Sequence, residues 1–211
     1  QRAEKSISAT DVKNLGLDGM QAHIYTPEGD FMAHIPIPGE HNVYNALAGT
    51  AVGLALGLTI QEIQQGIANA QTISGRTNVI HTAGMTVIDD CYNANPVSMK
   101  ASIEVLANTA GRRIAVLGDM FELGENAEQY HYEVGKYVAT KKIDELVVVG
   151  DLAQHIMQGV QDSNSDINCY SFKDNGEVAL YLLSVMQPED IVLIKGSNGM
   201  HLDEVVNNML G

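Results

Sequence analysis

The sequence predicts an α/β protein whose larger, C-terminal part folds as a parallel sheet with flanking helices. Short apolar segments with the length of buried strands recur through that part, at residues 78–81, 85–88, 114–117, 146–149, 168–172 and 191–194. Segments with a helical pattern follow them, at residues 97–108, 127–139, 152–160, 176–186 and 201–209. Strands that alternate with helices imply parallel crossover units and a doubly wound sheet.

A shorter N-terminal part precedes this sheet and is predicted to contain short strands and two helices. Segments 21–25 and 31–35 flank the sequence TPEGD, whose Pro, Gly and Asp suit a hairpin turn. An apolar segment at 42–56, rich in Ala and Leu, predicts a buried helix. A second helix is predicted at 60–70, because a capping-box sequence stands at its start.

The pattern changes near residues 74–77, and we place a domain boundary there. This gives one domain at 1–75 and a second at 76–211. The chain begins with Gln1 rather than Met, so we expect a fragment of a longer protein.

Composition and charge exclude several classes of function. The net charge of -14 repels nucleic acid and anionic membranes, so we expect neither as a partner. No apolar segment approaches the roughly 20 residues of a membrane span. The two cysteines have no metal-binding spacing, which favours a reducing, cytoplasmic setting. The seven histidines show no HExxH spacing, and we predict no metal ligands.

Polar clusters follow four of the predicted strands, at residues 89–96, 118–124, 150–151 and 195–200. In an open parallel sheet, ligands bind beyond the carboxyl ends of the strands. Aspartate suits a ribose hydroxyl, asparagine suits amide or amine groups, and a lysine between glycines can hold a carboxylate or phosphate. Each cluster also has a structural interpretation, because Gly, Asp and Asn end strands and cap helices.

Some single residues keep two interpretations. Asn42 and Asn45 share a helix face and could bind an adenine edge, although on their own a cap for Asn42 and a polar surface position for Asn45 are the favoured interpretation. Lys195 is either an anion ligand or a solvated strand end. Arg76, at the domain boundary, either reaches a phosphate or is a surface charge.

Taken together, these segments resemble the Mur ligase family. The resemblance rests on GEHNVYNALA at 39–48, SGR at 74–76, DDCYNANPVSM at 89–99, GDMFELG at 118–124 and KGSNGM at 195–200. These motifs occur in the family's order and span about 160 residues, of which YNANP is the most specific. One departure is Asn198, where the family often has arginine.

The resemblance implies a Rossmann-like C-terminal domain preceded by the last part of an α/β ATPase domain. It implies ATP-dependent peptide ligation with Mg²⁺, in which D-Ala-D-Ala is added to UDP-MurNAc-tripeptide through an acyl phosphate during peptidoglycan precursor synthesis. We expect a monomer. The sequence GxxxxGK[ST] of a P-loop does not occur in these 211 residues, so we expect the chain by itself to be inactive.

Residue roles also follow from the resemblance. Asn42 and Asn45 would contact adenine, and Arg76 the nucleotide phosphates. Asp90 would bind ribose, chosen over Asp89 for its distance to Tyr92. The substrate side would be lined by Tyr92, Asn93, Asn95, Lys195 and Ser197. Arg76 and Lys195 would take part in catalysis, with Asp119 and His131 as further candidates.

Two alternatives remain at this stage. One is another amide ligase of the same superfamily, similar to folylpolyglutamate synthetase, which YNANP and KGSNGM disfavour. The other is a non-enzymatic Rossmann module that binds a ligand. A P-loop upstream of Gln1 would favour a ligase over the binding module.

Overall fold

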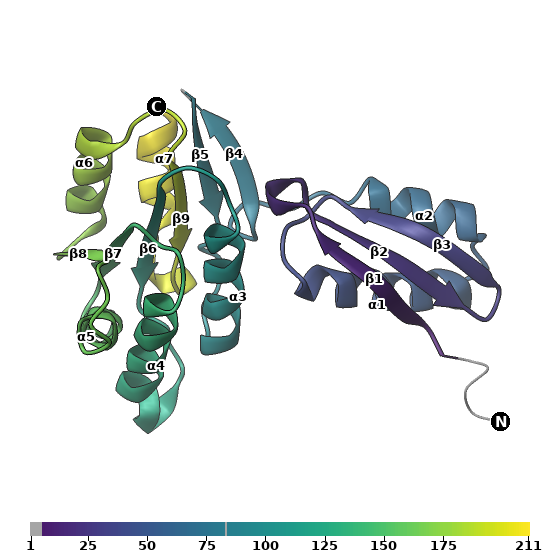
Figure 1. Ribbon diagram of the computed structural model, residues 1–211, viewed down its shortest axis with the longest axis horizontal. Helices are drawn as coiled ribbons and strands as arrows, with labels where there is room; N and C mark the ends of the chain where they lie inside the picture. The colour runs from purple at the N-terminus through teal and green to yellow at the C-terminus, as the bar shows by residue number, and fades with distance from the viewer. Residues whose placement is uncertain (1–5, 83) are drawn as a thin grey trace. The chain divides into compact units, whose positions relative to one another are not determined.

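The computed structural model describes residues 6–82 and 84–211, which form two compact units (Figure 1). The first unit ends at Thr72, and the second runs from Ile73 to Gly211. No helix among the described residues is both long and apolar enough to cross a membrane.

The first unit is a three-stranded antiparallel sheet covered by two helices. Its strands are β1 (Ser8–Asn14), β2 (Met20–Thr26) and β3 (Gly29–Ile35), with the short 3-10 helix η2 (Gly16–Asp18) between the first two. Its helices are α1 (His41–Ala55) and α2 (Ile60–Ala68). The predicted hairpin is confirmed as β2–β3, in which Thr26 pairs with Gly29.

The predicted capping box of α2 is also confirmed. The backbone N–H of Glu62 donates to the Thr59 hydroxyl at 3.3 Å, and the Thr59 N–H donates back to the Glu62 carboxylate at 2.8 Å. The prediction that the first helix is buried is wrong. Only one face of α1 packs on the sheet, and Tyr44 and Val52 on the rest of its surface are 68% and 60% exposed. The Ala-rich composition of this segment is compatible with a helix that packs through one face only, and so it did not distinguish that case from full burial.

The second unit is a six-stranded sheet with helices on both faces. The strands, in spatial order, are β4 (Asn78–Thr82), β5 (Met85–Asp89), β9 (Ile191–Lys195), β6 (Arg113–Gly118), β7 (Glu145–Val149) and β8 (Asn168–Phe172). All neighbouring pairs are parallel except β4–β5. The parallel α/β architecture predicted from the alternation of elements is therefore confirmed.

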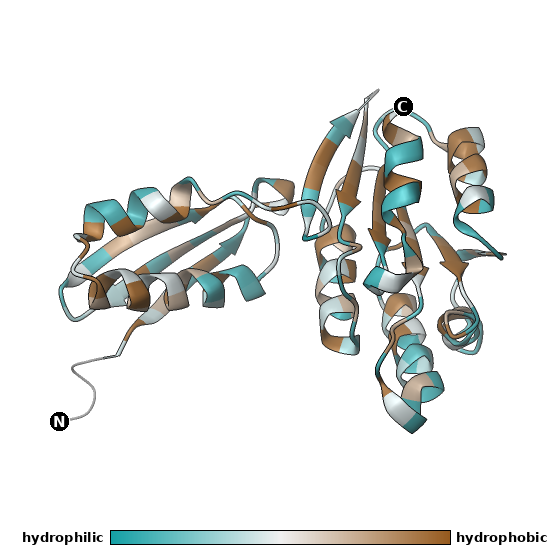
Figure 2. Ribbon diagram, turned by 180° about the vertical axis from the view of Figure 1, so that it is seen from behind, coloured by the Kyte–Doolittle hydropathy of each residue, from teal (hydrophilic) through white to brown (hydrophobic). Residues whose placement is uncertain are grey.

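Two helical layers enclose this sheet. The helices α3 (Pro96–Ala107), α4 (Ala127–Ala139) and α5 (Gln154–Gln161) pack side by side, and α6 (Asn175–Val185) packs against α7 (Asp203–Leu210). Two short 3-10 helices, η3 (Gly124–Asn126) and η4 (Asn198–Met200), follow strand ends. The strands are hydrophobic along most of their length, whereas the helices carry both kinds of residue (Figure 2). A strand buried on both faces needs such a continuous apolar run.

The edge strand β4 is the one antiparallel member of the described sheet. Only residues 83 and 84 separate β4 from β5 in the sequence, whereas a parallel connection needs a dozen or more. The strands therefore pair antiparallel, with Asn78 opposite Asp89. As a result, residues 74–77, which precede β4, lie at the same edge of the sheet as the carboxyl end of β5.

The contact between α4 and α5 depends on two glycines. A Cβ on Gly135 would lie 2.0 Å from the Ile156 carbonyl oxygen, and one on Gly159 would lie 2.3 Å from the Tyr132 carbonyl oxygen. The backbones of the two helices can approach this closely only without side chains at both positions.

We predict that Gly159→Ala destabilises the second unit by roughly 1–3 kcal/mol or more, because a methyl group would press on backbone that cannot rotate away. This loss would appear despite the gain of about 1 kcal/mol that alanine brings to a helix interior. Urea unfolding followed by circular dichroism, with hydrogen exchange to separate the two units, measures the effect.

The matched control is Gly66→Ala in α2, where a Cβ would meet nothing within 4 Å. This control should leave the second unit unchanged. Equal stability of the Gly159→Ala variant and the unmodified chain would contradict the close-packing argument.

Candidate functional site

The carboxyl ends of β5, β9, β6 and β7 meet at one edge of the second unit, since these strands are parallel neighbours. Three of the four predicted polar clusters are joined there by hydrogen bonds. Ser197 after β9 donates its N–H to the Asp119 carbonyl oxygen at 2.9 Å. The Phe121 N–H donates to the Ser197 hydroxyl at 2.8 Å. Ser197 therefore ties the loop after β9 to the loop after β6.

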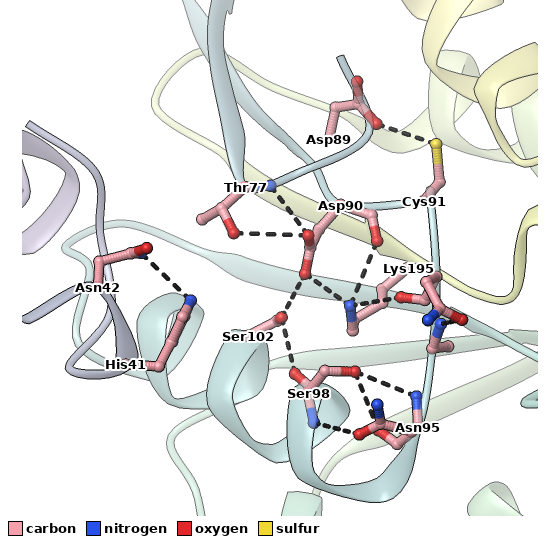
Figure 3. A network of polar contacts seen from close by, with 12 residues as sticks. His41, Asn42, Thr77, Asp89, Asp90, Cys91, Asn95, Ser98, Ser102 and Lys195 are labelled. Atoms are coloured by element: carbon pink, nitrogen blue, oxygen red, sulfur yellow. Dashed lines mark hydrogen bonds and ion pairs between the residues drawn. The ribbon is translucent and has the colours of Figure 1, made fainter. Parts of the chain in front are cut away.

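A buried ion pair joins the loop after β5 to β9 (Figure 3). The Lys195 ammonium donates to Asp90 Oδ2 at 2.7 Å and to the Asn93 carbonyl oxygen at 3.0 Å. The exposed fraction is 2% for Lys195 and 8% for Asp90. Lys195 is therefore an internal partner of Asp90 rather than a solvated strand end.

Asp90 accepts further hydrogen bonds from two other segments. Ser102 on α3 donates its hydroxyl to Asp90 Oδ2 at 2.5 Å. Thr77 donates its N–H to Asp90 Oδ1 at 2.9 Å and its hydroxyl to the same atom at 3.4 Å. Both carboxylate oxygens are thus occupied from within the chain, and the expected ribose contact of Asp90 stays a prediction that competes with these donors.

The neighbouring Asp89 is 1% exposed and binds the same segment before β4 that Thr77 belongs to. Its Oδ2 accepts from the Gly75 N–H at 2.7 Å and from the Ser74 hydroxyl at 3.1 Å. Its Oδ1 accepts from the Cys91 thiol at 3.0 Å. Burial raises the pKa of the Cys91 thiol, which makes it an unreactive side chain.

Arg76 stands in the sequence between Gly75 and Thr77, whose N–H groups donate to Asp89 and Asp90. Its side chain is exposed. Its guanidinium stacks on the Tyr92 ring, 4.1 Å from the ring centroid. Among the described residues, 6–82 and 84–211, no ion pair involves Arg76. Its five N–H donors are therefore not committed to a carboxylate, which suits the binding of an anion.

The two asparagines of the loop after β5 are exposed, and both have local partners. Asn93 accepts from the Ala94 N–H with its side-chain oxygen, at 2.8 Å. Asn95 is the N-cap of α3 and accepts from the Ser98 N–H at 2.9 Å. The Asn95 carboxamide thus has a structural role that its motif alone did not disclose.

His131 and Asp119 are both engaged in holding helices to the site. His131 is fully buried, donates from Nδ1 to the Ala127 carbonyl oxygen at 2.7 Å, and accepts at Nε2 from the Met120 N–H at 2.8 Å. Asp119 accepts from the Ala153 N–H at 2.7 Å, at the start of α5. Gly150 has a φ of 110° and packs so closely on Asp119 that a Cβ would lie 2.4 Å from its Oδ1. These contacts support the structural interpretation of the Gly150-Asp151 cluster.

In the first unit, Asn42 and Asn45 lie on one face of α1, as their spacing predicted. The Asn45 amide donates to the Asn42 side-chain oxygen at 2.9 Å, and the Asn42 amide donates to the Pro38 carbonyl oxygen at 2.8 Å. Both residues line a mainly apolar hollow of about 320 Å³ between α1, α2 and the end of β3.

Ser74, Thr77 and Ser102 anchor the two aspartates, and none of them was assigned a role from the sequence. Ser74 belongs to the SGR motif, which drew attention to Arg76, and no local pattern marks Thr77 or Ser102. Only the antiparallel pairing of β4 with β5 could have indicated that residues 74–77 lie beside Asp89 and Asp90.

Comparison with known proteins gives consistent matches. Residues 75–198 match the protein family described as Mur ligase, glutamate ligase domain. The chain is 34% identical over 207 residues to UDP-N-acetylmuramoyl-tripeptide–D-alanyl-D-alanine ligase of Escherichia coli K12, which covers 97% of this chain and 44% of that protein. It is 32% identical over 179 residues to the protein of the same name from Bacillus subtilis, covering 83% and 39%.

Solved structures agree with these matches. MurF from Acinetobacter baumannii has a TM-score of 0.87 and 33% identity, covering 97% of this chain and 44% of that one. MurF ligase from Thermotoga maritima in complex with ADP has a TM-score of 0.80 and 26% identity, covering 96% and 45%. The chain thus spans less than half the length of the curated relatives described above.

We predict that Lys195→Met destabilises the second unit by about 3–5 kcal/mol, because it leaves the buried Asp90 carboxylate without its cation. The double variant Lys195→Met/Asp90→Asn should recover part of this loss, since it removes both charges. Urea unfolding of the three proteins measures the changes.

Lys141→Met is the control, because Lys141 pairs with Glu104 at 2.5 Å on the surface, where such pairs contribute about 1 kcal/mol or less. If Lys195→Met costs no more stability than Lys141→Met, the buried pair does not hold the loop.

We predict that His131 makes the second unit less stable in mild acid. Burial lowers the pKa of its imidazole from the ordinary value of 6.5, and the Met120 N–H requires an unprotonated Nε2. The unfolded chain therefore binds a proton more readily, so this stabilisation is complete above about pH 6.5 and is lost as the pH falls below it.

The measurement compares the free energy of unfolding of the unmodified chain and of His131→Gln between pH 8 and pH 5. Glutamine can still accept from the Met120 N–H but does not titrate. The difference between the two curves should shrink as the pH falls, and a constant difference would refute the assignment.

Proposed function

This chain belongs to the Mur ligase family, as its motifs predicted, and from that premise we propose that it is the C-terminal part of an ATP-dependent ligase that joins D-Ala-D-Ala to UDP-MurNAc-tripeptide. The alignment with the Escherichia coli ligase over 97% of the chain carries the proposal. Both curated relatives described above carry the name of this ligase and not of a folate ligase.

In the proposed reaction, ATP phosphorylates the terminal carboxylate of the tripeptide, and the amine of D-Ala-D-Ala attacks the resulting acyl phosphate. A tetrahedral intermediate then collapses to the new peptide bond and releases phosphate. A carboxylate becomes a good electrophile only when one of its oxygens is turned into a leaving group. Fixed cations near the phosphates lower the barrier to both steps, because negative charge accumulates there.

Arg76 is the described residue best suited to that task. Its side chain is exposed, no acidic side chain of the described residues pairs with it, and its guanidinium carbon lies 4.1 Å from the centre of the Tyr92 ring. We assign it to the nucleotide phosphates, and Asn42 and Asn45 to the adenine end of ATP. Asn93 and Asn95 are exposed and keep their place as candidates for the dipeptide or acceptor side, although the side-chain oxygen of each accepts a local hydrogen bond. Ser197 and Tyr92, from the same sequence motifs, are further candidates.

Lys195 and Asp90 require a modified assignment. In the described arrangement, the Lys195 ammonium donates only to Asp90 and to the Asn93 carbonyl oxygen. We therefore propose that Lys195 acts in the reaction by shaping the loop after β5. A ribose contact of Asp90 would add to, or replace, one of its four internal hydrogen bonds.

Mg²⁺ enters the proposal as the ion carried by ATP. The described residues, with residues 1–5 and 83 aside, contain no group of three or more His, Cys, Asp or Glu side chains that could hold a metal ion. The two free cysteines support a cytoplasmic protein, which we propose to be a monomer.

The test of the function uses the full-length protein. It should release ADP in the presence of UDP-MurNAc-tripeptide only when D-Ala-D-Ala is added, and mass spectrometry should find the pentapeptide product. Product formation from a folate and glutamate instead would replace this proposal with a folylpolyglutamate synthetase-like activity. Binding of nucleotide without any ligation would support a binding module.

We predict that Arg76→Ala in the full-length ligase lowers kcat on the order of 10²-fold, with a smaller change in the ATP KM, because a positioned cation matters most to the charge of the transition state. The kcat of Arg76→Lys should lie between those of the unmodified ligase and of Arg76→Ala, since lysine keeps the charge and loses the planar fork. Steady-state kinetics with melting temperatures measure both.

Arg113→Ala is the control, because Arg113 pairs with Asp144 at the opposite end of the sheet. It should retain normal kinetics. Unchanged kcat and KM in Arg76→Ala would show that Arg76 is only a surface charge.

A further inference from the structure

We propose that Tyr92, together with the Asp89–Asp90 pair, is a positioning element that holds the Arg76 guanidinium in one orientation for its anion. This inference rests on the proposed function and deepens it. It gives Tyr92 a role through Arg76, whereas the sequence motif suggested a direct substrate contact.

The first support is the stack itself. The guanidinium carbon of Arg76 lies 4.1 Å from the centre of the Tyr92 ring, well inside the range of a favourable cation–π contact. Tyr92 is 47% exposed, so its ring is not needed to fill the core. Stacking on a flat ring removes much of the rotational freedom of a long side chain and leaves the N–H edge of the guanidinium available.

The backbone on each side of Arg76 is held as well. Gly75 donates its N–H to Asp89 at 2.7 Å, and Thr77 donates its N–H to Asp90 at 2.9 Å. The Tyr92 N–H donates to the Gly75 carbonyl oxygen at 2.9 Å. Both neighbours of Arg76 are therefore tied to the segment that carries Tyr92.

Two unusual conformations show how tightly this turn is constrained. Gly75 has a φ of 79°, which strains any other residue, and a Cβ there would lie only 3.0 Å from the Tyr92 Cβ, so a side chain would press on Tyr92. Thr77 has a φ of 49°, which is strained for a β-branched residue. Two hydrogen bonds from Thr77 to Asp90 hold it in that conformation.

Lys195 neutralises one of the two aspartates of this positioning element. Two adjacent buried carboxylates would repel each other and would also attract Arg76 away from an external anion. The Lys195 ammonium offsets the charge of Asp90 at 2.7 Å, and Asp89 is satisfied by neutral donors. Within the part of the chain that the structure describes, Arg76 thus pairs with no acidic side chain, although two aspartates lie at the strand end next to its turn.

The kinetic test is a double-mutant cycle in the full-length ligase, with Tyr92→Leu, Arg76→Ala and the pair combined. Tyr92→Leu should lower kcat roughly 2- to 30-fold, the range that a cation–π contact can supply. Tyr92→Phe keeps the ring and should stay within about 2-fold of the unmodified ligase. In the Arg76→Ala background, Tyr92→Leu should cause no further loss.

The outcomes of the cycle separate two roles for Tyr92. Absence of a further loss in the double variant supports positioning through Arg76. A loss equal to the product of the single losses, or a low kcat in Tyr92→Phe, would overturn it and indicate a direct contact with substrate. Tyr130→Leu is the matched control, because Tyr130 is also exposed, at 40%, and lies on α4, a helix that packs against α3 and α5.

A second measurement does not depend on catalysis. In the 211-residue chain, the ring current of Tyr92 should shift the NMR signals of the Arg76 side chain upfield. Tyr92→Phe should preserve this shift, and Tyr92→Leu should abolish it. Random-coil shifts for Arg76 in the unmodified chain would overturn the positioning role even if the ligase is active. Retained shifts in a protein that does not ligate would disprove the proposed function and leave the stack intact.

Discussion

The carboxylate of Asp90 is the constraint on which the arrangement of the site depends. It accepts hydrogen bonds from the turn before β4, from the middle of α3 and from the end of β9, and it stands at the end of β5. Three neighbouring segments of the chain and the far C-terminal strand β9 therefore meet at two oxygen atoms. Because the group is 8% exposed, none of these partners is readily replaced by water.

The antiparallel edge strand makes this meeting possible. A parallel β4 would have placed residues 74–77 at the opposite edge of the sheet, far from the carboxyl end of β5. The short connection between β4 and β5 reverses the chain and brings Arg76 next to the loop that contains Tyr92. The length of the connection between β4 and β5 thus determines whether Arg76 lies at the site.

Much of this fold could be predicted from the sequence. The apolar runs and the helices between them identify the sheet and its layers, and the capping box locates the start of α2. The direction of β4 could also have been predicted, because the two residues between β4 and β5 are too few for a parallel crossover. The exposure of one face of α1 could not have been predicted, since an Ala-rich sequence suits both a fully buried helix and a helix that packs on a sheet with one face only.

The residues of the site were easier to find than their partners. Polar residues after parallel strands pointed to Asp90 and Lys195, but the sequence could not show that the two face each other across 105 residues. Ser102 and Thr77 carry no local signal. The Asn95 carboxamide could serve a ligand or the N-terminus of α3, and only the backbone conformation reveals that it accepts from the Ser98 N–H.

A buried ion pair is a costly way to join strands, because the desolvation of both groups opposes their attraction and well-packed apolar side chains often stabilise a fold as much. Apolar side chains, however, would have no directional demand. Asp90 and Lys195 each satisfy several partners at hydrogen-bonding distance, and these contacts favour the described conformation of the loop after β5. The pair therefore specifies geometry more than it adds stability. Such a device suits the base of a turn that presents a cation to a ligand, where a displacement of about 1 Å can cost a large part of the rate.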